Sequence, residues 1–154
     1  MLIEPLWEGP LDVIGDVHGE LDALQALLAR LGYDPRGEHA QGRRLVFVGD
    51  LCDRGPDSPG VLGLVARLHR RGLAQAVLGN HELNVLRGVR KHGADWFFDA
   101  AGRPRLREFA APVEFLRSLP IALERADLRV VHASWHAGAI DTLRSEAAEP
   151  LSVF

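Results

Sequence analysis

Cysteine is scarce in this sequence of 154 residues, and an excess of positive charge is missing, with 18 Lys and Arg against 21 Asp and Glu residues. Cys52 is the single cysteine, which excludes an internal disulfide framework and fits a reducing cytosol. The formal net charge is −3, and no basic patch marks a protein that binds extended nucleic acid. A small nucleotide or a phosphorylated end is still compatible with this charge. We therefore expect a cytoplasmic protein without an extended nucleic-acid partner.

Long apolar runs and targeting signals are missing too. No run is long enough to span a bilayer, and the first residues include Glu4 and Glu8 instead of the basic and apolar segments of a signal peptide. With 47% hydrophobic and 25% charged residues, the composition is typical of a globular protein that buries a core. The sequence therefore predicts one domain over residues 1–154 and no membrane partner.

Short apolar runs alternate with helical patterns through the first 90 residues. Strands are expected over 11–14, 44–48 and 74–78, and helices over 20–31, 58–72 and about 82–90. Gly32 is expected to close the first helix, and Ser58 followed by Pro59 to open the second, with Ser58 as its N-cap. This alternation predicts an α/β fold with a parallel sheet and right-handed crossovers.

The pattern changes after residue 90. No regular element is assigned to 91–107, whose aromatic cluster Trp96-Phe97-Phe98 is interpreted as core or subunit contact, with stacking on a base or a peptide as the alternative. Further along the chain we expect a short helix over 112–118, an antiparallel hairpin formed by 121–123 and 128–131, and one short helix within 137–154.

Each of the three expected strands ends in a polar cluster. The clusters are Gly15-Asp16-Val17-His18-Gly19, Gly49-Asp50-Leu51-Cys52-Asp53-Arg54-Gly55 and Gly79-Asn80-His81-Glu82. In open α/β sheets, ligands bind at the carboxyl ends of strands, so we expect the clusters to share one edge of the sheet. Taken alone, each of these residues is most often a turn, cap or solvated loop residue. Three clusters in the same structural position favour a common functional site.

The side chains at this edge favour a metal site. Together with a histidine that follows the expected hairpin, the nitrogen and oxygen donors are Asp16, His18, Asp50, Asn80, His81 and His132. Such mixed donors suit Mn, Fe or Zn better than Ca, and two metals about 3.5–4 Å apart can supply a hydroxide and hold an in-line displacement at phosphorus. Arg54 offers a bidentate fork for phosphate oxygens. The pattern alone does not separate a ligand Asn80 from a proton-donating His81.

The three clusters resemble the signature motifs of the calcineurin-like metallophosphoesterases. The Asp53-Arg54-Gly55 and Asn80-His81-Glu82 versions are similar to those of the phosphoprotein-phosphatase branch, which includes serine/threonine phosphatases and diadenosine tetraphosphatases. The resemblance covers roughly residues 11 to 136 in the family's order. It implies a sandwich of mixed sheets with flanking helices.

The resemblance also implies a role for each polar side chain of the metal site. Asp16 and His18 bind a first metal, Asp50 bridges two metals, and Asn80 and His132 bind the second. The two ions are divalent, with Mn expected first and Fe or Zn as alternatives.

The remaining implied roles concern catalysis and the substrate. His81 acts as the general acid with its imidazole held by Asp53, while Arg54 and Asn80 contact the substrate phosphate. The implied reaction is hydrolysis of a phosphomonoester, on a protein or a small molecule, by direct attack of a metal-bound hydroxide. The alternatives are a diadenosine tetraphosphate-type nucleotide hydrolase and a catalytically impaired metal-binding interaction module.

The sequence departs from the family pattern in its last part. The family normally has one more histidine on the second metal, after a later strand, and a further phosphate-binding arginine. Neither motif is visible before Phe154, and His136 lacks the strand context of the missing ligand. We therefore expect an incomplete second sheet in a domain that is C-terminally truncated, with completion by a second chain or a degenerate relative as alternatives.

Overall fold

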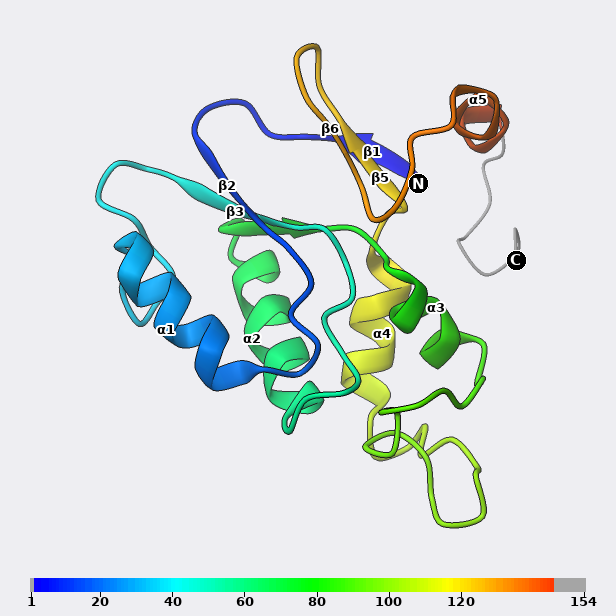
Figure 1. Cartoon of the computed structure of the whole chain (residues 1–154). Helices are drawn as coiled ribbons and strands as arrows, with labels where there is room; N and C mark the ends of the chain where they lie inside the picture. Colours follow the sequence, from blue (N-terminus) through cyan, green and yellow to red (C-terminus); the bar gives the residue numbers. More distant parts are fainter. Residues whose placement is uncertain (1, 146–154) are drawn as a thin grey trace.

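The structure, a computed structural model, describes residues 2–145, and this part of the chain forms two sheets of three strands each, with five helices (Figure 1). The first sheet has the order β2 (Leu11–Ile14), β3 (Arg44–Phe47), β4 (Ala74–Ala76). The second has the order β1 (Ile3–Pro5), β5 (Ala122–Glu124), β6 (Arg129–Val131). The helices are α1 (Leu21–Leu31), α2 (Ser58–Arg70), α3 (Asn80–Leu86), α4 (Ala110–Ser118) and α5 (Ala137–Ser145). None of the helices in 2–145 combines the length and apolarity needed to cross a membrane.

The strand ends of the first sheet are aligned. All its strands run parallel, and the register places Ile14 beside Phe47 and Phe47 beside Ala76. The loops that follow these three residues therefore leave the sheet at the same edge. This confirms the predicted parallel sheet and brings the three polar clusters together.

Two apolar layers cover the first sheet. Leu45 and Phe47 join the core formed with α1, α2 and α4, whereas Val46 joins a smaller cluster with Leu123 and Val130 of the second sheet. Neighbouring residues of a strand point to opposite faces, so β3 alone serves both layers. Figure 1 shows the same order, with α1, α2 and α4 on one side of the β2-β3-β4 sheet and the β1-β5-β6 sheet on the other. The expected α/β sandwich with flanking helices is thus confirmed.

The second sheet contains one strand that the sequence did not predict. The antiparallel β5–β6 hairpin is present as expected, but β1 adds a parallel neighbour that pairs Ile3 with Ala122. Three residues ending in Pro5 show no alternation to recognise. A proline is tolerated here because β1 is an edge strand.

One predicted N-cap and one predicted helix start are wrong, and both errors concern the site. The N-cap of α2 is Asp57, whose side chain accepts the N–H of Gly60, while the Ser58 hydroxyl instead accepts the N–H of Asp53 at 2.8 Å. Helix α3 begins at Asn80, before the expected start near Glu82, because Glu82 reaches back to the N–H of Gly79 at 2.9 Å. Gly32 closes α1 with φ of 93°, as predicted.

The segment after α3 owes its shape to aromatic packing. Phe97 and Phe98 are buried, with their rings edge to face at 5.2 Å between centroids, which confirms their assignment to the core. Trp96 is half-buried and packs edge to face on Phe109 at 5.1 Å between centroids. Helix α5 provides the short helix expected in the tail, and the rest of that tail lies outside the described residues.

Candidate metal centre

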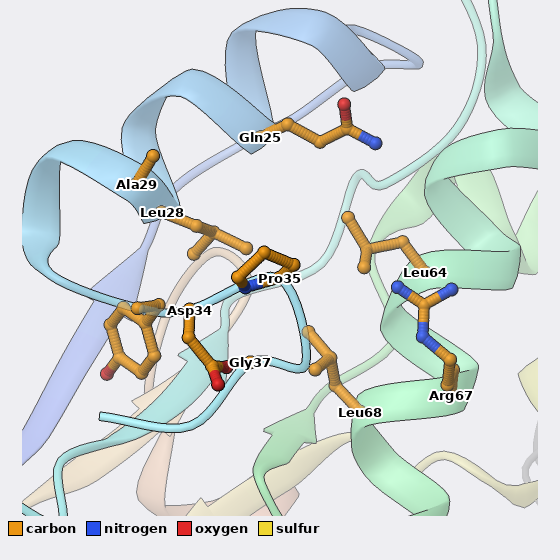
Figure 2. A pocket seen from close by; sticks show the side chains of 10 residues that line it. Gln25, Leu28, Ala29, Asp34, Pro35, Gly37, Leu64, Arg67 and Leu68 are labelled. Carbon is orange, nitrogen blue, oxygen red and sulfur yellow. The ribbon is translucent and has the colours of Figure 1, made fainter. Parts of the chain in front are cut away.

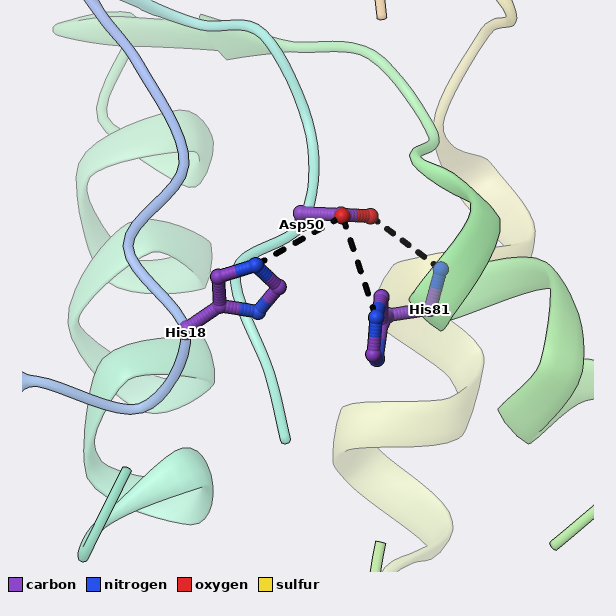
Figure 3. Close-up of side chains that lie close together, drawn as sticks. All are labelled: His18, Asp50 and His81. Atoms are coloured by element: carbon purple, nitrogen blue, oxygen red, sulfur yellow. Dashed lines mark hydrogen bonds and ion pairs between the residues drawn. The ribbon is translucent and has the colours of Figure 1, made fainter. Parts of the chain in front are cut away.

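The carboxylate of Asp50 lies at the centre of the site. Its Oδ2 atom is 3.7 Å from Nε2 of His18, 3.4 Å from Nε2 of His132 and 3.9 Å from Nε2 of His81. Asp50 is buried, and Figure 3 shows it between His18 and His81. These separations between side-chain atoms are longer than typical hydrogen bonds, so the three imidazoles surround the Asp50 carboxylate, which accepts a hydrogen bond only from the backbone N–H of His81, at 3.1 Å, among these residues.

The orientation of His18 fits a metal ligand. Its Nδ1 atom lies 3.1 Å from the carbonyl oxygen of Cys52, which can only accept a hydrogen bond, so Nδ1 carries the proton and Nε2 keeps its lone pair. That Nε2 atom is buried with no hydrogen-bond partner, and it lies 3.8 Å from Oδ2 of Asp16. A carbonyl that orients an imidazole with its free nitrogen toward carboxylates is the usual arrangement behind a metal-bound histidine.

His132 shows the same arrangement from the opposite side. Its Nδ1 atom donates to the carbonyl of Val48 at 2.9 Å, which leaves the lone pair on Nε2. That lone pair faces Oδ1 of Asn80 at 3.0 Å as well as the Asp50 carboxylate. Nitrogen and oxygen donors gathered this closely form the mixed set that divalent metal ions bind.

These side chains come from four different strand ends. His18 follows β2, Asp50 follows β3, Asn80 lies in the first turn of α3 after β4, and His132 follows β6. The N–H groups of Val17 and His18 both donate to the carbonyl of Asp50, at 3.0 and 2.9 Å, so the first two loops are bonded directly. The structure therefore brings together all the expected metal-site side chains, including the one from the second sheet.

Backbone strain is concentrated at the site. Within residues 2–145, the non-glycine residues with positive φ are His18 (47°), Asp50 (48°), Asp53 (70°) and Arg54 (69°). Such conformations cost about 1–3 kcal/mol each and persist where surrounding contacts fix them. Asp16 and His18 lie close together, 3.8 Å apart, but through a left-handed residue and not through the extended segment from which a shared ion was expected, and their binding of one ion stays a prediction.

Glu82 is a site residue for which no role was predicted from the sequence. It is fully buried, and its carboxylate accepts the N–H groups of Asp50, Leu51 and Gly79 at 2.8–2.9 Å and that of Cys52 at 3.2 Å. One side chain therefore holds the loops after β3 and β4 together. Its position at the third residue of α3, typical of a capping glutamate, is the signal that could have revealed this role.

Cys52 shares the same buried pocket. Its thiol donates to Oε1 of Glu82 at 3.2 Å. Burial above all, and then the negative charge of Glu82, raise the pKa of the Cys52 thiol well above its usual range. A raised pKa disfavours the thiolate form, which fits a thiol that donates its hydrogen to Glu82.

His81 is held by a chain of buried hydrogen bonds. Its Nδ1 atom lies 2.7 Å from Oδ2 of Asp53, and the other oxygen of Asp53 accepts the indole N–H of Trp96 at 2.6 Å. Because the carboxylate accepts at Nδ1, Nε2 of His81 faces the site, 3.4 Å from Nη2 of Arg54. The sequence missed Trp96, since no local pattern connects residues that are 43 positions apart.

The site opens into a polar cavity. A pocket of about 300 Å³ is lined by Arg54, Asn80, His81, Asn84, Lys91 and His92. A second cavity, of about 350 Å³, lies between α1 and α2, and none of the predicted site residues lines it (Figure 2). Leu28, Leu64 and Leu68 form its apolar wall.

The fold and the site together define the class of protein. Residues 9–149 match the model of the calcineurin-like phosphoesterase family, so the chain belongs to this family of metal-dependent phosphoesterases, and the resemblance of its motifs is confirmed. Among curated proteins, it is 38% identical over 139 residues to the symmetrical bis(5'-nucleosyl)-tetraphosphatase of Ralstonia nicotianae. It is 49% identical over 74 residues to the asymmetrical bis(5'-nucleosyl)-tetraphosphatase PrpE of Oceanobacillus iheyensis.

Solved structures give the same result for the fold. The chain is 26% identical to the cold-active protein-tyrosine phosphatase of a psychrophilic Shewanella species, with a TM-score of 0.67 over 91% of this chain and 48% of the other. The match to the Ralstonia protein covers 85% of this chain and 45% of that relative, and the match to the Oceanobacillus protein covers 46% and 30%. The chain therefore spans less than half the length of these relatives.

Proposed function

We propose that this chain carries the site of a metal-dependent phosphoesterase. The observation that carries the proposal is the pair of Nε2 lone pairs, on His18 and His132, that face the Asp50 carboxylate from two sides. Neutral imidazoles held at Nδ1 by backbone carbonyls are prepared to bind cations.

The proposed ligands follow the geometry of the acceptors. Asp16 and His18 hold one metal, Asn80 and His132 hold a second, and Asp50 lies between the two sets. Bound there, divalent ions would neutralise phosphoryl charge and lower the pKa of water. We propose manganese first, with iron or zinc as alternatives, because the donors are nitrogen and oxygen without a thiolate.

The remaining side chains act on the substrate. Arg54 offers its guanidinium to the phosphoryl oxygens, assisted by the amide of Asn80. His81 donates a proton from Nε2 to the departing oxygen, and Asp53 fixes the ring and stabilises its cationic form. In this role His81 is the acid and not a ligand, although His18, Asp50 and His81 offer donor atoms within 4.8 Å of one another.

Two substrate classes are compatible with this machinery. Phosphomonoesters, on proteins or small molecules, require the proton that His81 supplies, because an alkoxide is a poor leaving group. Cleavage of a dinucleoside tetraphosphate is the second candidate, favoured by the names of the Ralstonia and Oceanobacillus relatives. A metal-binding interaction module without turnover is the candidate of a different class.

The test is a titration of Mn²⁺ against hydrolysis of p-nitrophenyl phosphate. We expect metal-dependent turnover that is lost in Asp50→Asn and retained in Asp127→Asn, which changes an exposed aspartate paired with Arg125. Phosphate release from a phosphopeptide, compared with cleavage of diadenosine tetraphosphate, then separates the two substrate classes. A folded protein that binds Mn²⁺ and hydrolyses none of these compounds would contradict the enzyme and favour the interaction module.

The cellular location of the protein and the completion of its domain are also proposed. A single cysteine with a buried, protonated thiol supports a cytoplasmic location. That the chain forms a single domain stays a prediction. That this domain is a truncated one, or is completed by a second chain, stays a prediction as well. Size-exclusion chromatography with light scattering measures whether such a partner is a second copy of this chain.

A further inference from the structure

The polar pocket beside Arg54 has an unusual lining. Its six residues are Arg54, Asn80, His81, Asn84, Lys91 and His92. Each carries nitrogen in its side chain, and none carries a carboxylate. The volume of about 300 Å³ is at the lower end of the range of small-molecule pockets. Such a lining favours an anionic occupant.

Lys91 and His92 are held at this pocket by the backbone that follows them. The carbonyl of Gly93 accepts the N–H of Arg54 at 3.1 Å, so the 91–93 segment lies directly on the loop that carries the arginine. Gly93 has φ of 83°, and a Cβ atom there would lie 2.5 Å from the backbone nitrogen of Arg54. The contact between Trp96 and Asp53 anchors the same segment a second time.

The charge of Lys91 is not used elsewhere. It is the only lysine among the 18 Lys and Arg residues of the chain. The neighbouring Arg90 is paired with Asp95 at 2.5 Å, whereas Lys91 and Arg54 have no carboxylate at ion-pair distance within residues 2–145. Two unpaired cations that line one pocket repel each other until an anion lies between them.

We propose that Lys91, together with His92, binds the leaving phosphate group of the substrate, which departs when the bridging P–O bond is cleaved. This inference rests on the proposed function. His81, the proposed acid, lines the same pocket, so the departing oxygen enters it. A phosphate would accept hydrogen bonds from Lys91 and His92, whereas a neutral alcohol or a tyrosine ring would leave the charge of Lys91 unpaired and would meet no apolar side chain. These two residues thus select a chain of phosphates over a simple monoester.

The corresponding hydrolysis balances without a further reactant. A water oxygen forms a bond to the phosphorus held by Arg54, and the bridging P–O bond breaks. The departing phosphate keeps the electron pair of that bond. The protons of the water end on the two phosphate products or in the solvent.

The first test compares the binding of tripolyphosphate and orthophosphate by calorimetry in the presence of Mn²⁺. In Lys91→Met, we expect the affinity for tripolyphosphate to fall about tenfold more than that for orthophosphate. Arg90→Met removes the same charge one residue away from the pocket, and there we expect the ratio of the two affinities to stay as in the wild type. An equal loss for both anions, or no loss for tripolyphosphate, would overturn the proposal.

The second test uses the uniqueness of the lysine. An amine-acetylating reagent can modify only Lys91 and the chain terminus, and peptide mapping separates the two products. We expect tripolyphosphate to protect Lys91 at about tenfold lower concentration than orthophosphate does. Equal protection by the two anions contradicts the proposal. Because binding and protection require no turnover, both tests still decide the question if the proposed hydrolase activity is absent.

Discussion

The Nδ1 atom of His81 lies 2.7 Å from Oδ2 of Asp53, and both residues are buried. A carboxylate can only accept here, so the pair fixes which ring nitrogen carries the proton and leaves Nε2 facing the pocket. The second oxygen of Asp53 is bound by Trp96, so the orientation of His81 depends on a residue that does not line the pocket.

Replacing His81 by asparagine separates the role of acid from that of ligand. We expect His81→Asn to lower kcat for an alkyl phosphate by about 10²–10⁴-fold, because a general acid contributes on that order. The loss should be smaller for p-nitrophenyl phosphate, whose leaving group needs less help from a proton. Calorimetry should detect the same number of bound Mn²⁺ ions as in the wild type. A variant that loses an ion would instead identify His81 as a ligand.

Replacing Trp96 by phenylalanine tests the outer end of the hydrogen-bond chain. The ring packing on Phe109 is kept, but Asp53 loses the donor at 2.6 Å and is too buried to recruit water. We expect a loss of about 1–3 kcal/mol in the free energy of unfolding, measured in urea. We also expect kcat to fall, since the ring of His81 is less firmly held.

The matched control for this change is Trp135→Phe. The ring of Trp135 lies below the guanidinium of Arg129 at 4.9 Å and is no part of the site. We expect kcat of that variant to match the wild type. A wild-type kcat in Trp96→Phe would show that the indole only fills space.

Replacing Glu82 by glutamine keeps the volume of the side chain but turns one acceptor into a donor that faces backbone N–H groups. At least one of the N–H groups of Asp50, Leu51 and Gly79 then loses its partner in a fully buried place. We expect a loss of about 3 kcal/mol in unfolding free energy, together with weaker Mn²⁺ binding because the Asp50 loop loosens.

In the control Glu38→Gln, an exposed pair with Arg71 is removed, and the change in unfolding free energy should stay below about 1 kcal/mol. Similar losses in the two variants would exclude the organising role of Glu82.

Asp12 makes stability depend on pH in the acidic range. Its carboxylate accepts from Nε of Arg43 and from the hydroxyl of Tyr33, both at 2.8 Å, and the Arg43 hydrogen bond above all holds the pKa of Asp12 below its ordinary value. A carboxyl whose pKa is lower in the folded state contributes stability above its unfolded pKa, near 3.9, and loses that contribution as pH falls through the folded value. We expect the stability difference between wild type and Asp12→Asn to be largest near pH 6 and to shrink below about pH 4. Urea unfolding in the presence of a chelator measures it, and a difference that does not change with pH would refute the assignment.

The alternation of strands and helices up to α3 could be predicted from the sequence because its signals are local. Apolar runs such as 45–48, glycine at Gly32 and helical spacing within α1 act over a few residues. The prediction that the polar clusters share one edge of the sheet followed from the parallel order of the strands. The register, which places Ile14 beside Phe47, confirms that the strand ends are aligned. The boundaries were less predictable, since the start of α3 depends on how Glu82 bonds backward to Gly79.

The second sheet was predictable only in part. Its hairpin has a strand pattern on both arms, but β1 is recognisable only once Ile3 pairs with Ala122, more than 100 positions away along the printed sequence. A three-residue segment ending in proline carries too little local preference to specify a strand.

For the site, local sequence was enough to identify the chemical groups at the strand ends. Asp16, His18, Asp50, Asn80 and His81 follow three apolar runs whose parallel pairing aligns them. The nitrogen that each imidazole presents is known only from the folded chain, because it depends on the carbonyls of Cys52 and Val48 and on the carboxylate of Asp53. The folded chain also shows that Trp96 and Glu82 hold the site together. The physical reason is range: backbone preference and hydrophobic spacing act over a few residues, whereas a hydrogen bond between segments exists only after the core has packed them against each other.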